Sequence, residues 1–181
     1  MSAELDRIKV LLAGVLGLVL MLGVARFAYT PLLPLMQAQA GLDSDVGAWL
    51  ASINYLGYLS GALIAASISD MQLKDRLYRV GIVLAIVTTL AMALTTDWRL
   101  WALLRYVAGL SSAAGLLLGS GLVLNWLMRH QYRSELGIHF AGIGTGIALT
   151  ALAVELSTPY LDWQAQWLWF GAVAFSWLFR L

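Results

Sequence analysis

The chain has 181 residues, of which 61% are hydrophobic and only 12% are charged. Soluble domains have about 25% charged residues, and a soluble domain of this length could not bury so much apolar surface. The composition therefore excludes a soluble enzyme, a nucleic-acid-binding protein and a disordered tail. The chain has no cysteine and only two histidines, so we expect no metal site and no cofactor. A net charge of +1 carries no information about a partner.

Six apolar runs are long enough to cross a bilayer, which takes about 20 residues in a helix. They cover residues 10–36, 46–69, 78–95, 100–128, 136–157 and 163–179. The connections between them are short, so successive helices are expected to be antiparallel neighbours. The connections cover residues 37–45, 70–77, 96–99, 129–135 and 158–162. The sequence therefore predicts an all-α polytopic membrane protein with a single six-helix domain over residues 1–181.

Lysine and arginine lie almost entirely on one side of the predicted bundle. That side collects Arg7, Lys9, Lys74, Arg76, Arg79, Arg129, Arg133 and Arg180. The other side has Arg99 together with Asp43, Asp45, Asp97 and Asp162. Because cytoplasmic loops carry the excess of basic residues, we expect the first side and both termini to be cytoplasmic. The last run ends at this inner interface, where we expect a cut chain or a contact with a partner.

The first run holds an arginine at membrane depth. Arg26 is ten residues before Met36, which places it roughly 15 Å from the outer end of the run. A charge in hydrocarbon costs at least about 2.5–3.5 kcal/mol, so such a residue faces the bundle interior or a wet cavity. Tyr29 follows within one turn, and Pro31 interrupts the backbone hydrogen bonds just beyond it. Arg26 and Tyr29 are therefore candidates to bind or gate an anionic solute.

The second run holds Asn54 and Tyr58, which lie four residues apart and share a helix face. They indicate either a polar cavity wall or an interhelical hydrogen bond, typically worth about 0.6 kcal/mol. The second and fifth runs also contain pairs of glycines four residues apart, at 57 and 61 and at 142 and 146. Such faces permit close helix approach.

The fourth and fifth runs add two more charges. Arg105 lies roughly 8–10 Å inside the outer end of its run, so it is expected to share a layer with Arg26. Glu155 lies two or three residues from the outer end of the fifth run, above that layer. Two guanidinium groups would suit an anionic ligand. Alternatively, Glu155 neutralises one arginine as an ion pair or extends to the interface.

His139 lies near the cytoplasmic end of the fifth run. Two interpretations remain open for it, a role in proton relay and a packing histidine near the interface.

Several motifs resemble those of the major facilitator superfamily (MFS). The segment after the second run resembles the signature G-x-x-x-D-R-x-G-R-R, with Asp70 at the aspartate and Arg76 next to the last basic position. Ala66, Leu73 and Asp75 depart from that signature. Arg105, four residues before a glycine, is similar to the superfamily motif whose arginine is linked to proton coupling. Residues 24–34 (VARFAYTPLLP) and 137–144 (GIHFAGIG) resemble the bacterial YbfB/YjiJ-like branch.

The resemblance implies the N-terminal six-helix half of an MFS transporter in a bacterial inner membrane. In that fold, helices one and four line the cavity, two and five form the seam between halves, and three and six face lipid. The resemblance therefore implies that the glycine pairs of the second and fifth runs contact the second half. The implied function is secondary active transport of a small, anionic solute, with the bilayer, the solute and a second six-helix half as partners. That half is part of a longer chain or another subunit. Asp70, Glu155 and His139 are implied coupling or ion-pair residues. The alternative is a non-transporting assembly or regulatory subunit derived from a transporter half.

Overall fold

The structure is a computed structural model that describes residues 2–178, and every element within them is a helix. The elements are α1 (Ser2–Leu18), η1 (Val19–Val24), α2 (Tyr29–Ala40), α3 (Ser44–Ser67), α4 (Met71–Met92), α5 (Trp98–Ala113), η2 (Ala114–Gly119), α6 (Ser120–Arg129), α7 (Leu136–Ser157) and α8 (Trp163–Leu178). The predicted all-α fold is confirmed. Arg180, assigned above to the basic side, lies outside the described residues.

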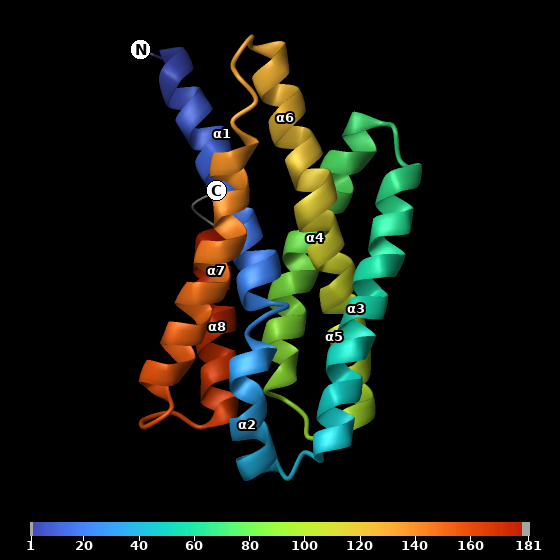
Figure 1. Ribbon diagram of the computed structural model, residues 1–181, viewed down its shortest axis with the longest axis vertical. Helices are drawn as coiled ribbons and strands as arrows, with labels where there is room; N and C mark the ends of the chain where they lie inside the picture. Colours follow the sequence, from blue (N-terminus) through green and yellow to red (C-terminus); the bar gives the residue numbers. More distant parts are fainter. Residues whose placement is uncertain (1, 179–181) are drawn as a thin grey trace.

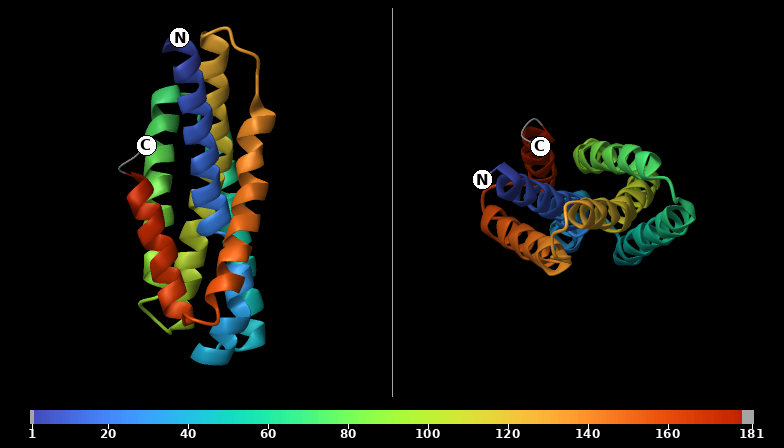
Figure 2. Two further views of the ribbon diagram at one scale, coloured as in Figure 1. Left: turned by 90° about the vertical axis from the view of Figure 1, so that its left-hand side faces the viewer. Right: turned by 90° about the horizontal axis from the view of Figure 1, so that it is seen from above.

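These elements form six rods that run up and down the long axis of the molecule (Figure 1). The first rod is α1, η1 and α2, and the fourth is α5, η2 and α6. Seen from above, these two rods occupy the middle, with α3 and α7 along one side and α4 and α8 along the other (Figure 2). α3 packs mainly on α5, and α7 packs on α1 and η1. This layout is the one that the resemblance to an MFS half implies.

Aspartates precede four of the described helices, and before α8 the side chain of Asp162 accepts from Ala165 N at 2.7 Å. Asp43 caps α3, and its side chain accepts hydrogen bonds from the backbone of the first turn. Asp70 caps α4 and Asp97 caps α5 in the same way. Such caps satisfy backbone N–H groups that have no partner within the helix. Because α4 begins at Met71, most of the predicted connection 70–77 is its charged first two turns.

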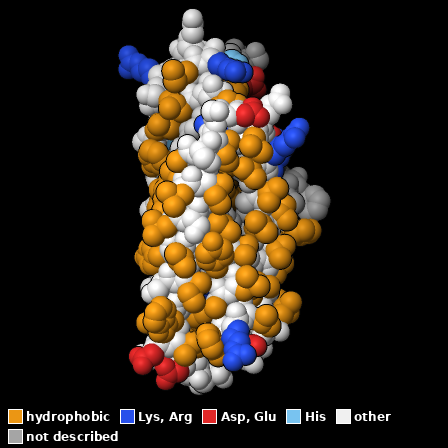
Figure 3. All heavy atoms as spheres, turned by 90° about the vertical axis from the view of Figure 1, so that its right-hand side faces the viewer, with side chains coloured by type: hydrophobic (Ala, Val, Ile, Leu, Met, Phe, Trp, Pro, Cys, Tyr) orange, Lys and Arg blue, Asp and Glu red, His pale blue; other side chains and the backbone are white. Residues whose placement is uncertain are grey.

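Four rods are long and apolar enough to cross a membrane, against six predicted runs. They are Glu4–Ala40, Ser44–Ser67, Trp98–Arg129 and Leu136–Ser157. α4 begins with a charged segment, and the described part of α8 has only 16 residues. Hydrophobic side chains cover the middle of the face in Figure 3, and charged side chains gather toward its two ends. This distribution is typical of a protein whose middle lies in a bilayer.

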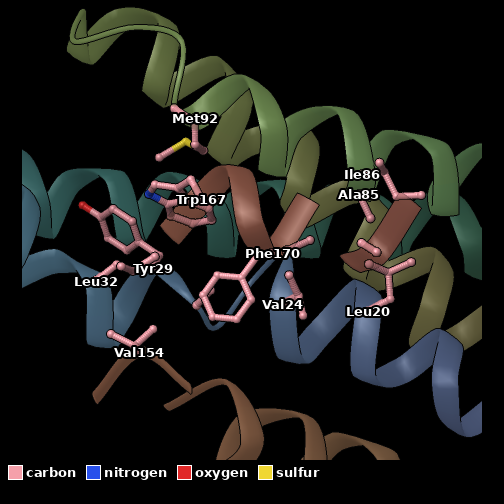
Figure 4. Packing of buried hydrophobic residues seen from close by; sticks show 14 of the residues in the cluster. Leu20, Val24, Tyr29, Leu32, Ala85, Ile86, Met92, Val154, Trp167 and Phe170 are labelled. Atoms are coloured by element: carbon pink, nitrogen blue, oxygen red, sulfur yellow. The ribbon is translucent and has the colours of Figure 1, made fainter. Parts of the chain in front are cut away.

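The hydrophobic core joins the first rod to α4, α7 and α8. Tyr29 and Leu32 of α2 lie near Met92 of α4 and Trp167 of α8, with Phe170 farther along α8 (Figure 4). All five side chains are buried. The core therefore holds α2 in place directly beside the charged residues of the first rod.

The glycine pairs pack inside this bundle. A methyl group at Gly57 would collide with the carbonyl of Tyr106 in α5, and one at Gly61 would come within 2.7 Å of Ala113 in α5. The pair in α7 approaches the first rod, where a methyl at Gly142 would lie 2.7 Å from the Val15 carbonyl oxygen. The prediction that these faces contact a second half is wrong. Glycine spacing indicates a close approach, but it does not say which helix approaches.

Candidate functional site

The first rod is interrupted in its middle. η1 is a π-helix, in which N–H groups bond to carbonyls five residues earlier, and Ala25 N bonds to Leu20 O at 2.9 Å. Residues 25–28 then form a turn before α2 begins at Tyr29. Pro31 lies in the first turn of α2, where its ring and missing N–H prevent regular helix from continuing through this segment.

Arg105 supplies hydrogen bonds that this break leaves unmade. Its Nη1 donates to the carbonyl of Ala25 at 3.1 Å, and its Nη2 donates to the carbonyl of Arg26 at 2.9 Å. In a continuous α-helix both carbonyls would accept backbone N–H groups four residues later, but Thr30 N bonds instead to Phe27 O. Because the membrane interior offers no water to such carbonyls, the buried Arg105 replaces two backbone donors.

Asn54 and Tyr29 hold Arg105 in position. Asn54 Nδ2 donates to the Arg105 carbonyl at 2.7 Å, which ties α3 to α5. The guanidinium carbon of Arg105 lies 4.6 Å from the centre of the Tyr29 ring, within the range of a cation–π interaction. The Tyr29 hydroxyl in turn donates to the carbonyl of Gly47 at 2.9 Å. The break in the first rod is therefore connected to both α3 and α5.

The side chain of Arg26 packs against α3. Its guanidinium carbon lies 4.4 Å from the ring centre of Tyr58 and 4.7 Å from that of Tyr55. Arg26 is 7% exposed. Within residues 2–178 its Nε has no hydrogen-bond partner, and no carboxylate lies within ion-pair distance of it. A guanidinium in this state retains donors for a carboxylate or phosphate oxygen.

A small cavity lies beside the two arginines, with a volume of about 70 Å³. It is lined by Arg26, Phe27, Tyr29, Thr30, Ala51, Asn54, Tyr55 and Arg105. Since a water molecule takes about 30 Å³ of liquid volume, the cavity has room for a group the size of a carboxylate.

The structure brings together five of the predicted site residues and separates the other three. Arg26, Tyr29, Asn54, Tyr58 and Arg105 surround the break in the first rod. Asp70 caps α4 at one end of the bundle, and Glu155 is exposed on α7. Among the described residues neither forms an ion pair, so the ion pair considered between Glu155 and an arginine is absent. His139 is buried beside Ser120.

Sequence reasoning missed two features of the site. Tyr55 is a second aromatic partner of Arg26, although only Asn54 and Tyr58 share the helix face that was singled out. The Ser112 hydroxyl lies within hydrogen-bond distance of the carbonyls of Met21 in η1, at 2.9 Å, and of Ala108 in its own helix, at 2.8 Å, so it lies at the contact between the two central rods. The only sign of the Ser112 contact in the sequence is a serine inside an apolar run. No group of residues suited to a metal ion is found in the described part of the chain.

The profile of the family described as uncharacterised MFS-type transporter YbfB matches residues 18–181. The chain belongs to this family. It is therefore a multi-pass membrane protein of an MFS transporter family, and the predicted resemblance is confirmed.

Three relatives agree with this family. The chain is 34% identical to the uncharacterised MFS-type transporter YceJ of Bacillus subtilis over 92 residues, which are 51% of this chain and 24% of the relative. It is 30% identical to the MFS-type transporter hepF of Aspergillus oryzae, over 64% of this chain and 24% of the relative. It is 24% identical to the efflux pump radE of Floropilus chiversii, over 80% and 27%. The matched part thus spans about a quarter of each relative. No solved structure matches the chain significantly.

Proposed function

We propose that this chain forms one half of a secondary active transporter for a small solute, and that Arg26 binds an anionic group of that solute. The observation that supports this most directly is the buried Arg26 guanidinium, which lies between two tyrosines without a carboxylate partner among the described residues. A buried cation without a counter-ion is unfavourable. A carboxylate or phosphate in the adjacent cavity would supply that counter-ion and accept two parallel hydrogen bonds.

A second six-helix unit would supply the other wall of the transport cavity. In the most apolar part of α3, and likewise of α7, 28% of the residues are buried. The corresponding shares in the first and fourth rods are 56% and 50%, so the α3/α7 side has surface left to cover. A symmetric dimer of this chain would place two copies of Arg26 and Arg105 around one cavity. That concentration of positive charge would be unfavourable. A complementary, non-identical half therefore fits better than a second copy.

The same proposal places the protein in a bacterial inner membrane with the beginnings of α1 and α4 in the cytoplasm. The basic residues of these segments support this orientation. A cysteine introduced by Gln72→Cys, in a chain that has none, should resist a membrane-impermeant thiol reagent in intact cells and react after the cells are opened. Labelling in intact cells would contradict the orientation.

Replacing Arg26 by alanine should abolish most transport of the anionic solute. Truncating one partner of a buried charge pair costs about 2–5 kcal/mol, so kcat/KM should fall by at least about thirtyfold. Arg26→Lys retains the charge but lacks the planar fork, so its kcat/KM should lie between those of the parent and of Arg26→Ala. The measurement is uptake of a panel of radiolabelled mono- and dicarboxylates into proteoliposomes that contain the full-length protein.

Arg99→Ala is the matched control, because Arg99 is exposed at the start of α5 and is not among the residues that line the cavity. A folded Arg26→Ala variant that transports every tested anion like the parent would refute the role of Arg26. If the parent, together with its second half, transports none of the panel, the non-transporting subunit becomes the better interpretation.

A further inference from the structure

His139 of α7 is buried at the junction of three helices. It is 1% exposed, and its Nε2 lies 3.0 Å from the hydroxyl oxygen of Ser120 in α6. On the α1 side, a methyl group at Gly14 would lie 2.6 Å from Nδ1 of the ring and 2.9 Å from a methyl carbon of Val123. The imidazole therefore fills the space that a side chain at position 14 would need.

Ser120 determines which ring nitrogen carries the proton. The Ser120 hydroxyl donates its only proton to the carbonyl of Leu116, so toward His139 its oxygen can only accept. The hydrogen-bond network thus assigns the proton to Nε2 and the lone pair to Nδ1. Within the described residues, Nδ1 has no hydrogen-bond partner.

A cavity of about 500 Å³, with several polar side chains in a mainly apolar lining, reaches the same place from the end of the bundle where α6 ends. We call it the vestibule. Its polar lining consists of Asp75, Tyr78, Arg79, Asn125, Arg129 and His130. Gly14 and Val123 also line it. A Cβ at position 14 would contact both Nδ1 and a methyl carbon of Val123, so Gly14 and Val123 form the wall of the vestibule next to the unpaired nitrogen.

We propose that Nδ1 of His139 is a gated proton-binding site, filled from water in the vestibule when the packing of α1 against α6 and α7 opens. A proton from that water would add to the lone pair and give an imidazolium whose two nitrogens are both donors. The closed packing offers Nδ1 no acceptor, and an unpaired buried donor is unfavourable. Protonation therefore favours the open arrangement, and opening in turn favours protonation.

The charged groups around the ring do not supply the missing acceptor. Glu135, one turn before His139, is held by Arg7 of α1 through two hydrogen bonds of 3.1 and 3.2 Å. In the vestibule, Asp75 of α4 is paired with Arg79, and the Tyr78 ring lies beside them. Arg129 and His130 at the end of α6 complete the titratable and charged groups that face this region. None of them bonds to the His139 ring, so an imidazolium in the closed state has no counter-ion in contact.

This site deepens the proposed function, on which its use in transport rests. A proton that binds only when the first rod separates from α6 and α7 would tie protonation to a movement of a central rod. In a transporter, such a site makes the proton the coupling ion. Proton binding itself needs no solute, so it can be tested apart from transport.

Two measurements on the full-length protein in lipid nanodiscs test the site. Hydrogen–deuterium exchange at the imidazole C2 position, followed by mass spectrometry, reports the titration and access of each histidine. At alkaline pH, His139 should exchange at least about tenfold more slowly than His130, as expected for opening that costs 1.4 kcal/mol or more. Spin labels at Leu12→Cys and Ile138→Cys, both on exposed positions, report the spacing of α1 and α7.

On acidification, this spacing should increase at the pH where His139 takes up its proton. His139→Asn should lose that response, and His130→Gln should retain it because His130 stacks on Trp126 outside the junction. Val123→Ala thins the wall and should speed exchange at His139 but not at His130, which tests access without removing the histidine.

Three results would overturn the proposal: exchange at His139 as fast as at His130, a spacing independent of pH while His139 titrates, or a response that persists in His139→Asn. None of these readouts involves a solute. Failure of the Arg26 transport experiment would therefore leave them intact, and their failure would leave the role of Arg26 intact.

Discussion

Replacing Arg105 by alanine is expected to destabilise the protein by about 3 kcal/mol, because it leaves the carbonyls of Ala25 and Arg26 without donors. A buried carbonyl left unpaired costs about 1–3 kcal/mol, and the membrane interior provides no water as a substitute. The midpoint of unfolding, measured in detergent by heating or by titration with a denaturing detergent, should fall accordingly.

Arg105→Lys separates the hydrogen bonds from the charge. A lysine retains a cation beside Tyr29 but lacks the planar fork that reaches two carbonyls at once. Its stability should therefore lie between those of the parent and the alanine variant. Arg99→Ala, at an exposed position of the same helix, should leave the midpoint unchanged. Equal midpoints for Arg105→Ala and Arg99→Ala would show that the bonds to the break contribute nothing.

The contrast between the two arginines shows how far sequence reasoning could go. Counting residues at 1.5 Å each placed Arg26 and Arg105 in one layer, and the structure confirms that they adjoin. The partners of Arg105 could not be predicted, because they are backbone carbonyls exposed by a turn at residues 25–28. Pro31 indicated an interruption of the helix, but no side-chain pattern in the sequence indicates the π-helix and the turn before it.

Asp70 and Glu155 show how local structure limits what can be predicted from the sequence. Asp70, directly before a helix, fits the pattern of an N-cap, and its carboxylate bonds to the first turn of α4. The resemblance to the family motif instead implied a coupling or ion-pair role for Asp70. Glu155 was considered as a counter-ion on depth alone, but depth along a helix does not fix the direction of a side chain, and the structure leaves it exposed.

Gly57→Ala is expected to have a similarly large effect, because the crossing of α3 and α5 has no room for a methyl group. The carbon added by Gly57→Ala would collide with the carbonyl of Tyr106. On the facing helix, the carbon added by Gly109→Ala would collide with the carbonyl of Asn54. The neighbour is backbone in each case and cannot rotate away. Overpacking a tight contact costs about 1–3 kcal/mol and sometimes more, so either variant should lower the unfolding midpoint.

Gly144→Ala and Gly121→Ala are matched controls, since a methyl group at either position meets no atom within 4 Å. In a helix, alanine is favoured over glycine by about 1 kcal/mol, so both controls should be neutral or slightly stabilising. The crossing also positions the site, because Asn54 and Arg105 bond across it. Gly57→Ala should therefore weaken anion transport as well as stability. A Gly57→Ala protein as stable as Gly144→Ala would mean that α3 and α5 can separate without disturbing the fold.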